Sequence, residues 1–473
     1  MTDRTEFKKH ASRVIEWIAE YFENIERYPV KSLVKPGEIY NQLPDNAPSN
    51  NEDFEKIIID FEKIIMPGIT HWQSPNFFAY FPANNSFPSI LGEMLTAALG
   101  AQCMKWETSP AAAELEEKMM NWLKHLTGLP ESFQGVIQDT ASTSTLCAIL
   151  SARENASGFK INEEGFTNKK YRVYSSSEAH SSVEKAVKIA GIGSKNIVKI
   201  RTDEQLALIP EKLEKAIKKD IESGFTPLCV VAALGTTGTT AVDPLKQIAE
   251  ITTKYGIWLH IDAAYAGSAL ILPEFRWMIN GIEKADSFVF NPHKWLFTNF
   301  DCSAYFVKSK EKLVHTFQIV PEYLKTRTDG TVNDYSDWGI QLGRRFRALK
   351  LWFVLRSFGV EKMQEILRSH ISYAQFFAEE IEKTGKFKVV TPVRFSLVCF
   401  RYIPDNSLDD KALNDINEKL LQKINSTGKI YLSHTRVNGN FVLRLHCSQT
   451  NVEKRHIEEA LDFIKNIAFV NPE

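Results

Sequence analysis

The sequence predicts an α/β protein with a mostly parallel central sheet, preceded by a helical segment and followed by a smaller α+β unit. Three observations lead to this class. Short apolar segments alternate with amphipathic segments between about residues 110 and 300, which is typical of strands buried between helical layers. The chain is 473 residues long, which allows about three structural units. Its content of 44% hydrophobic and 24% charged residues is that of an ordinary globular protein.

Residues 1–85 are expected to form helices that pack on a partner surface. Apolar side chains recur every three or four positions over residues 6–27, which predicts the apolar face of an amphipathic helix. A second helix is predicted over residues 51–68, where Pro67 and Gly68 end it. A polar connection separates the two helices, so this segment lacks a core of its own.

Residues 86–350 are expected to form the α/β domain. A helix over residues 111–128 precedes the first strand. The predicted strands are residues 135–138, 171–177, 228–234, 257–264 and 287–290. In such sheets ligands bind beyond the carboxyl ends of the strands, so the residues that follow these strands are the candidates for a site.

Residues 351–473 are expected to form a smaller α+β domain, whose first helix begins slightly earlier. The predicted helices cover residues 346–360, 372–385, 409–428 and 452–468, and a strand covers residues 395–403. A hairpin over residues 430–446 is expected to turn at Asn438 and Gly439, because these two residue types suit the left-handed conformations of a two-residue turn.

Charge and cysteine content exclude several classes of protein. The chain carries 57 Lys and Arg against 58 Asp and Glu, a net charge of −1, which argues against binding to nucleic acid or to an acidic membrane. No run of 18 apolar residues and no secretory signal is visible, so a cytoplasmic protein without a membrane span is expected. The six cysteines show no CxxC spacing, which favours free buried thiols and predicts no metal site.

Polar residues stand at the ends of the predicted strands. Residues 140–144 open a helix, and residues 235–240 form a Gly-Thr turn, so the backbone N–H groups of both segments can hold a phosphate. Asp262 ends one buried strand, and Lys294 follows the next in a setting so apolar that burial would lower the pKa of its amine. His180 follows a further strand and begins a helix.

Each of these residues has an ordinary structural explanation when it is taken alone. Residues 140–144 and His180 could simply cap helices, and most lysines are solvated. Taken together, they supply a phosphate anchor, an acid for a pyridinium nitrogen and an amine for a Schiff base. These are the groups that pyridoxal 5′-phosphate (PLP) requires, so we expect PLP to be the cofactor.

Eight stretches of the sequence carry a resemblance to a known family. They are HWQSPNFFAYFP (71–82), GVIQDTASTSTLCAILSAR (135–153), SSEAHSSVEKA (176–186), LGTTGTT (234–240), HIDAAYAGSA (260–269), FNPHKWLFTNFDCSA (290–304), PEYLK (321–325) and LGRRFRALKLWFVLRSFG (342–359). In these stretches the chain resembles the group II PLP-dependent amino-acid decarboxylases, and most closely the aromatic-L-amino-acid decarboxylases. The likeness runs from the N-terminal helix to at least residue 370, and NPHKW after an apolar strand is a highly specific signal within it.

The resemblance implies the fold type I of PLP-dependent transferases. It also implies a homodimer whose active sites form at the interface, with residues 1–85 packing across it. Lys294 would bind the cofactor covalently, Asp262 would keep the pyridine nitrogen protonated, and His180 would stack on the ring. The remaining residues implied to hold the phosphate or to lie near the cofactor are Ala141, Ser142, Asn291, Thr237 and His293.

The implied reaction is decarboxylation of an aromatic L-amino acid to the corresponding amine and CO2. Tyr323, in PEYLK, would protonate the carbanion. In the related aldehyde synthases the change resembles replacement of this tyrosine by Phe or of the stacking histidine by Asn, whereas this chain has Tyr323 and His180. The amine is therefore expected as the main product, and oxidative formation of an aldehyde is the alternative. The family match at Tyr323 disfavours an aminotransferase, and the absence of a basic helix-turn-helix segment disfavours a PLP-binding regulator.

The implied substrate pocket is aromatic. The residues that match the family's pocket are Trp72, Tyr80, Phe81 and Pro82, for which core packing is the other explanation. The positions at which the chain departs from the animal pattern are Ala83, Met104 and Gln341. These departures place Dopa-type specificity in question. Tryptophan, phenylalanine, tyrosine and their hydroxylated forms stay open, and a glutamate or histidine decarboxylase is the second choice.

Overall fold

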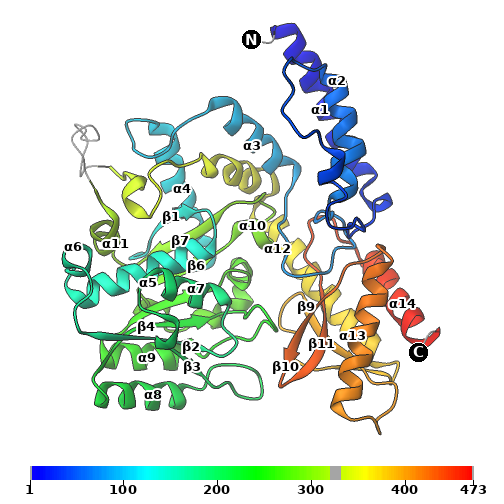
Figure 1. The fold of residues 1–473 in the computed structure, drawn as a ribbon. Helices are drawn as coiled ribbons and strands as arrows, with labels where there is room; N and C mark the ends of the chain where they lie inside the picture. Colours follow the sequence, from blue (N-terminus) through cyan, green and yellow to red (C-terminus); the bar gives the residue numbers. More distant parts are fainter. Residues whose placement is uncertain (1–2, 320–331, 471–473) are drawn as a thin grey trace. The chain divides into compact units, whose positions relative to one another are not determined.

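The computed structural model describes residues 3–319 and 332–470, and the chain forms two compact units (Figure 1). One unit is Ala83–Ile371, and the other combines Met1–Pro82 with Ser372–Glu473. The three-part division into residues 1–85, 86–350 and 351–473 stays a prediction, since here the two end segments of the chain share one unit.

A seven-stranded sheet forms the centre of the unit Ala83–Ile371. Its strands are β1 (Gln134–Gln138), β2 (Lys170–Ser176), β3 (Ile197–Ile200), β4 (Phe225–Ala233), β5 (Trp258–Asp262), β6 (Ser287–Phe290) and β7 (Ser303–Val307). They lie in the order β1-β7-β6-β5-β4-β2-β3. The pairs from β3 to β6 are parallel, and β7 runs antiparallel to both of its neighbours. The predicted α/β class with a mostly parallel sheet is confirmed.

Helices cover both faces of this sheet. In Figure 1, α5 and α7 lie on one face, and α8 and α9 lie on the other. The α-helices that begin within the unit are α3 (Phe87–Leu99), α4 (Pro110–Thr127), α5 (Ala141–Ser157), α6 (Ile161–Glu164), α7 (Ser181–Ile189), α8 (Pro210–Glu222), α9 (Leu245–Tyr255), α10 (Pro292–Trp295), α11 (Lys310–Phe317) and α12 (Arg347–Glu382). Strands enclosed on both faces are mostly apolar, and all four residues of β6, three of them apolar, are buried.

The second unit contains a four-stranded antiparallel sheet in the order β10-β11-β9-β8. Its strands are β8 (Phe387–Val389), β9 (Leu397–Tyr402), β10 (Ser433–Val437) and β11 (Asn440–His446). The hairpin turns at Asn438 and Gly439, whose φ angles are 50° and 86°, as predicted. Helices α13 (Asp410–Ser426) and α14 (Lys454–Val470) belong to the same unit.

The N-terminal helices α1 (Arg4–Glu23) and α2 (Phe54–Asp60) also belong to this second unit. Helix α1 lies beside α2 and the π turn that follows it, with His10 stacked on Phe54 at 4.1 Å between ring centroids and with Arg13 paired to Glu62 at 3.2 Å. No residue of α1 is buried, although the helix has an apolar stripe. The stripe is therefore at most partly covered within the described chain, and Phe7 and Ile15 on it are exposed.

Several elements differ from the prediction. Strands β3 and β7 are missing from it, because IVKI and SAYFV lie in mixed polar surroundings without clear boundary signals. The predicted second helix is α2 followed by a π turn (Phe61–Ile65) and a 3-10 turn (Met66–Gly68). The two helices predicted over residues 346–385 are present in α12, where they meet at Gly359, whose backbone is not helical (φ 69°), and no loop separates them.

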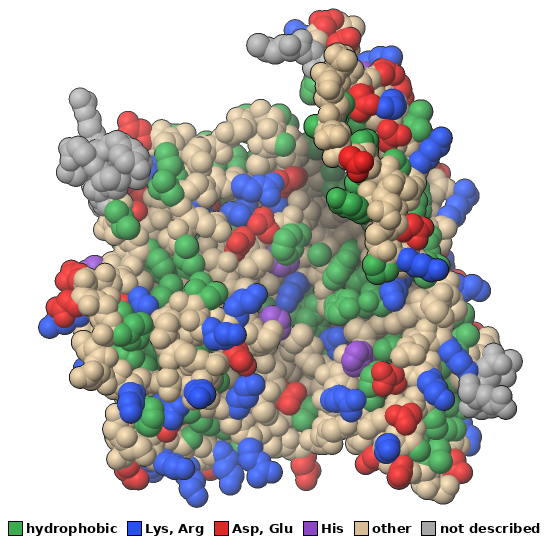
Figure 2. Space-filling view, in the orientation of Figure 1, with side chains coloured by type: hydrophobic (Ala, Val, Ile, Leu, Met, Phe, Trp, Pro, Cys, Tyr) green, Lys and Arg blue, Asp and Glu red, His purple; other side chains and the backbone are tan. Residues whose placement is uncertain are grey.

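The surface and the cysteines complete this description. Figure 2 shows Lys and Arg side chains interspersed with Asp and Glu on the face drawn, as expected for a net charge of −1. All six cysteines are free and buried. Among the described residues, no helix combines the length and the apolar character needed to cross a bilayer, and no cluster of metal-binding side chains occurs.

Candidate active site

Two neighbouring strands of the large sheet place an acid and an amine at the same edge. Asp262 is the last residue of β5 and lies opposite Val289 of β6 in the parallel pairing. Lys294 lies on the short helix α10, which follows β6. The Asp262 carboxylate accepts a hydrogen bond from the Ala264 N–H at 3.1 Å, which fixes its direction. The sequence-predicted acid and amine are thus brought to one edge.

Lys294 is held by its backbone and by its surroundings. The amide of the buried Asn84 donates to the Lys294 carbonyl at 2.8 Å, and the Asn84 N–H donates to the His293 carbonyl at 3.0 Å. Burial lowers the pKa of the Lys294 amine, and the negative charge of Asp262 partly opposes this shift. A larger fraction of this amine is therefore uncharged near neutral pH than in a solvated lysine.

His180 caps a helix and also interacts with both of these residues. Its Nδ1 accepts a hydrogen bond from the Ser182 N–H at 3.1 Å at the start of α7, and the Ser182 hydroxyl lies 2.8 Å from the same atom. Although the residue keeps solvent-exposed surface, partial burial of the ring lowers its pKa, which the Asp262 charge opposes and the Lys294 charge reinforces. Because Nδ1 accepts a hydrogen from a backbone N–H, the neutral ring carries its own hydrogen on Nε2.

The first turn of α5 has the features of an anion site. Thr140 is the N-cap residue, yet its side chain makes no capping hydrogen bond. Ala141 is buried and Ser142 is exposed at the following two positions. The N–H groups of a helix's first turn have no partner within the helix and carry partial positive charge. Simple capping by Thr140 therefore does not explain this segment.

A pair of serine hydroxyls joins this helix start to the turn before Lys294. Ser303 donates to the Asn291 side-chain oxygen at 2.7 Å and lies 3.5 Å from the hydroxyl of Ser144 in the first turn of α5. Asn291 and Ser303 are both buried. The structure thus brings Asn291 and the 141–142 segment into one polar region, as the predicted phosphate site requires.

Two further predicted residues have different settings. Thr237 is exposed in the turn after β4, where the Thr236 hydroxyl accepts from the Ala241 N–H at 3.0 Å. His293 is buried, and its Nδ1 accepts from the Cys302 N–H at 2.9 Å. Burial lowers the pKa of His293 to about 3. The His293 ring therefore has a structural role: it accepts a hydrogen bond from the backbone at Cys302. The position of His293 next to Lys294 in the sequence does not reveal this role.

The three departures from the animal pattern lie in the same unit. The Gln341 amide donates to Asp139 at 3.2 Å, and the other oxygen of Asp139 accepts from the Thr140 N–H at 2.5 Å. Gln341 is thereby connected to the residue before the cap of α5. The Met104 carbonyl accepts from the Ser336 N–H at 2.8 Å, and Ala83 is the first residue of the unit.

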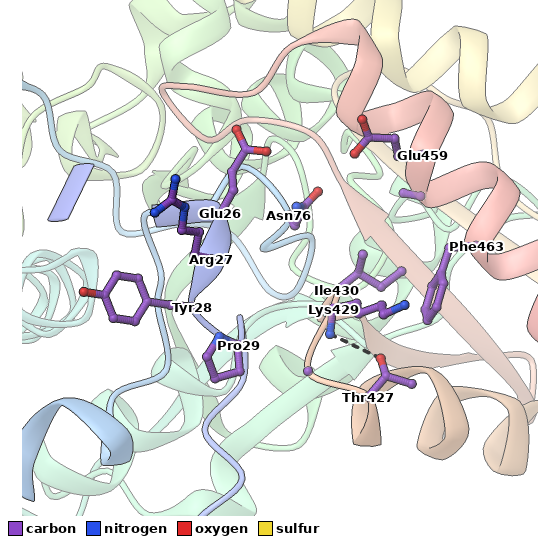
Figure 3. A pocket seen from close by; sticks show the side chains of 12 residues that line it. Glu26, Arg27, Tyr28, Pro29, Asn76, Thr427, Lys429, Ile430, Glu459 and Phe463 are labelled. Carbon is purple, nitrogen blue, oxygen red and sulfur yellow. Dashed lines mark hydrogen bonds between the residues drawn. The ribbon is translucent and has the colours of Figure 1, made fainter. Parts of the chain in front are cut away.

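The aromatic candidates Trp72, Tyr80, Phe81 and Pro82 lie in the other unit. Trp72 stacks on Tyr80 with 5.8 Å between ring centroids, and both side chains are partly exposed. A separate cavity of about 510 Å³ in this unit is lined from residues 26–29, Asn76, residues 427–430 and α14 (Figure 3). None of the predicted site residues lines that cavity.

The structure does not test the predicted role of Tyr323, and it adds contacts of Asn84 and Ser303 that the sequence did not predict. Tyr323 lies outside the described residues. Asn84 and Ser303, which hold the Lys294 turn and the Asn291 side chain, were not predicted. A signal for Asn84 existed, because a polar Asn-Asn-Ser run follows the aromatic 71–82 stretch. Ser303 offers no such signal, since a serine in a strand is unremarkable.

The donor set fits PLP. The start of α5 with Asn291 supplies hydrogen-bond donors for a phosphate, Asp262 supplies a fixed negative charge for a ring nitrogen, and Lys294 supplies an amine of lowered pKa. The Thr140 side chain makes no capping hydrogen bond to the first turn of α5. This is the observation that favours an anion at this end of the helix.

Comparison with known proteins agrees with this chemistry. Residues 36–403 match the family described as "Pyridoxal-dependent decarboxylase conserved domain". A tyrosine decarboxylase of Papaver somniferum is 43% identical, with 97% of this chain and 93% of that protein aligned. A phenylacetaldehyde synthase of Arabidopsis thaliana is also 43% identical, with 98% and 96% aligned. The solved tryptophan decarboxylase of Catharanthus roseus, in complex with L-tryptophan, is 41% identical over 99% of both chains, with a TM-score of 0.93.

Proposed function

The chain belongs to the pyridoxal-dependent decarboxylase family and is a PLP-dependent carboxy-lyase of its aromatic amino-acid branch, and we propose that it releases CO2 from an aromatic L-amino acid and forms the corresponding amine. The observation that carries this proposal is the electrostatic grouping of His180, Asp262 and Lys294 at one sheet edge. Each of these three residues could have a purely structural role, but such roles would not explain why the three lie together.

Each cofactor contact is assigned to a residue of this chain. Lys294 would hold PLP through its amine, Asp262 would face the ring nitrogen, and His180 would lie against the ring. The residues proposed for the phosphate and the rest of the cofactor are Ala141, Ser142, Asn291, Thr237 and His293. When bound, PLP supplies a conjugated ring that accepts the electrons released as the bond between Cα and the carboxylate breaks.

The protein groups control charge and protons around that bond cleavage. Asp262 keeps a carboxylate aimed by the Ala264 N–H, so its field is in place before the reaction begins, which is the most effective form of electrostatic stabilisation. His180 is neutral and presents its Nε2–H, because the cap on α7 occupies Nδ1. Lys294, with its lowered pKa, can take up and return a proton near neutral pH.

The proton that completes the amine is assigned to Tyr323 on the basis of the sequence. Relatives at 43% identity include both a decarboxylase and an aldehyde synthase, so overall identity does not select between the amine and the aldehyde. The presence of both Tyr323 and His180 supports the amine. Formation of an aldehyde is the alternative, and peroxide released in step with CO2 would identify it.

The substrate side chain is assigned to the aromatic class. The stacked pair of Trp72 and Tyr80 offers flat apolar surface for an aromatic ring, and the solved relative named above binds L-tryptophan. Tyrosine, tryptophan, phenylalanine and their hydroxylated forms are the candidates. Among the three positions that differ from the animal pattern, Gln341 is the one with a hydrogen bond toward the proposed phosphate site, because its amide donates to Asp139.

A second copy of the chain is the proposed partner, with an active site formed at the interface. Helix α3 exposes an apolar row at successive turns, and Phe87, Leu91, Leu95 and Leu99 are each about half or more exposed. Such a row on a soluble protein marks an interface. Mass measurement by light scattering tests the dimer, and Leu95→Glu should shift it toward a monomer if α3 lies in the interface.

One experiment tests the proposed reaction. The PLP-loaded enzyme is incubated with a panel of L-amino acids, and CO2, amine, aldehyde and peroxide are measured in the same vessel with Lys294→Ala as the blank. Amine equal to CO2 without peroxide supports the proposal. No CO2 from any aromatic amino acid would overturn the substrate class, and CO2 from glutamate or histidine instead would favour the second choice.

A further inference from the structure

Tyr80 has a backbone conformation that is unusual for a large residue. Its φ angle is +53°, in the left-handed region. A large non-glycine residue is uncommon there, and such a residue persists only where its surroundings hold it. The Tyr80 side chain is 47% exposed, so its own burial does not supply that hold. The contacts around Tyr80 must therefore fix it.

The contacts come from the segment that leads into β10. The Tyr80 N–H donates to the Ser433 hydroxyl at 3.1 Å, and the Tyr80 hydroxyl lies 3.2 Å from the hydroxyl of Tyr431. Tyr431 is itself paired with the chain just before Tyr80. Its N–H donates to the Asn76 carbonyl at 3.2 Å, and its carbonyl accepts from the Phe78 N–H at 2.9 Å. Residues 76–80 thus run alongside this segment, and an isolated parallel bridge pairs Phe77 with Tyr431.

Ser433 is in turn fixed by a buried arginine. Arg444 lies directly opposite Ser433 in the pairing of β10 with β11, and its Nη1 donates to the Ser433 hydroxyl at 2.7 Å. The guanidinium also lies over the Phe81 ring, 5.5 Å from its centroid. The two lone pairs of the Ser433 oxygen are therefore occupied by Arg444 and by the Tyr80 N–H. A serine so placed cannot rotate freely.

The ring of Tyr80 is fixed from two directions. One face stacks on Trp72, and its hydroxyl end meets Tyr431, whose ring lies at 78° to it with 5.9 Å between centroids. Burial and the Tyr80 hydroxyl raise the pKa of Tyr431 to about 12, so the Tyr431 phenol keeps its hydrogen at neutral pH. One phenol donates to the other, and the pair sets the direction of the Tyr80 ring.

We propose that Tyr431 and Ser433 are positioning residues for substrate selection, because they hold Tyr80 in its left-handed conformation and orient its ring for the aromatic substrate. The proposal rests on the proposed function, in which Tyr80 lies in the substrate pocket. It assigns part of the specificity to the C-terminal sheet, at residues some 350 positions along the chain from Tyr80.

The test is a double-mutant cycle on the PLP-loaded enzyme. Tyr431→Phe, Tyr80→Phe and the double variant are compared for kcat and KM with the best aromatic amino acid of the panel. Loss of one neutral hydrogen bond corresponds to about a 3- to 10-fold effect. Each single variant should raise KM by that factor with kcat within about twofold, and the double variant should match either single one. Equal KM in Tyr431→Phe and wild type, or multiplication of the two effects in the double variant, would overturn the proposal.

Matched variants separate positioning from general stability. Tyr402→Phe removes a buried phenol hydroxyl that donates to the Ala468 carbonyl in the same unit, and it should leave KM unchanged. Ser433→Ala should raise KM, whereas Ser433→Thr keeps the hydroxyl and should restore the wild-type KM. A KM increase in Tyr402→Phe equal to that in Tyr431→Phe would show that loss of stability alone accounts for the effect.

A readout without turnover keeps the two proposals distinguishable. If no aromatic amino acid releases CO2, the proposed function fails. In that case the coupling between the two hydroxyls is measured by urea unfolding of Tyr431→Phe, Tyr80→Phe and the double variant. The unfolding midpoint of the double variant should shift by the same amount as that of either single variant. Additive shifts would show that the two hydroxyls do not act through each other, and would reject the positioning pair whatever the reaction is.

Discussion

The imidazole of His180 accepts the N–H of Ser182 through Nδ1, at 3.1 Å, so the ring that caps α7 is also the ring that interacts with Asp262 and Lys294. The cap fixes the neutral tautomer with hydrogen on Nε2. Protonation of the ring would remove the lone pair that accepts the Ser182 N–H. Burial lowers the pKa of His180 below its usual 6.5, so this loss is expected only in acid.

Replacement of His180 by asparagine should change the products. The shorter side chain lacks an aromatic face, and the proposed decarboxylase identity depends on this histidine together with Tyr323. We expect His180→Asn to release aldehyde and peroxide in proportion to CO2, measured with a peroxide-coupled assay. Ser181→Ala, at the neighbouring exposed position, is the control. Amine as the only product of His180→Asn would contradict this assignment.

Lys294→Ala should abolish turnover. The variant removes the only amine that the proposal gives to the cofactor, and removal of a covalent catalytic group costs about 1,000-fold or more. CO2 release is the measurement, and circular dichroism checks that the fold is kept. Lys308→Ala, whose amine donates to the Glu283 carbonyl on the surface, should leave the rate unchanged. Residual activity above a tenth of wild type would exclude Lys294 from this role.

Asp262→Asn should slow the reaction without loss of the fold. The amide keeps the size of the side chain and an oxygen to accept the Ala264 N–H, but it lacks the negative charge. Loss of a preorganised charge of this kind costs about 100- to 1,000-fold in kcat. The rate is measured at saturating PLP, so that weaker cofactor binding does not contribute. Full recovery at high PLP would show that Asp262 acts only in binding.

Stability should decrease in mild acid because of buried histidines. Burial lowers the pKa of His260 from 6.5 to about 4 and the pKa values of His293 and His370 to about 3. Between pH 6.5 and about 4 the unfolded chain takes up protons at these sites and the folded chain does not. Each histidine therefore contributes up to about 1.4 kcal/mol of destabilisation per pH unit in that window.

His370→Gln isolates one of these contributions. His370 accepts the Trp295 indole N–H at 3.0 Å, and a glutamine oxygen can accept it without titrating. The variant should be less stable at pH 7 but lose less stability between pH 6.5 and 5, as measured by urea midpoints. A variant whose midpoint falls with pH as steeply as that of wild type would show that His370 does not contribute.

Gly92→Ala should destabilise the unit Ala83–Ile371. Helix α3 approaches α12 so closely at Gly92 that an added Cβ would lie 2.7 Å from the Lys350 Cα. Backbone cannot yield as a side-chain end can, and overpacking costs about 1–3 kcal/mol. The thermal midpoint should fall, and an unchanged midpoint would show that the two helices can move apart at this position.

The sequence predicted the elements whose signals are local. Asp262 and Lys294 could be placed because each follows a continuously apolar strand, and neighbouring parallel strands end at the same edge. Strand β7 was missed because it runs antiparallel between β1 and β6, and the helix before it, α10, is a single turn of four residues. Its position depends on its partners, which periodicity does not show.

The parts of the site that could not be predicted depend on distant pairs. The Asn84 bond to Lys294 joins residues 210 positions apart, and the Ser303 bond to Asn291 crosses from β7 to the residue after β6. The conformation of Tyr80 is a stronger case, because the sequence favours no left-handed tyrosine and the contacts with Ser433 and Tyr431 become visible only in the structure. For His180 the sequence left two explanations, a helix cap and a contact in the site. The structure is compatible with both, because the ring caps α7 and also interacts with Asp262 and Lys294.

The division of one unit between the two ends of the chain has a consequence for biosynthesis. Phe77 and Phe78 are fully buried, and their partners include Tyr431 and Leu443. A ribosome adds about 5–20 residues per second, so these phenylalanines leave it on the order of tens of seconds before their partners exist. The unit Ala83–Ile371 can fold in that interval, while the first segment waits with its aromatic residues uncovered. The newborn chain is therefore most exposed to chaperones and to aggregation at its N-terminal segment, and the end of translation releases it from that state.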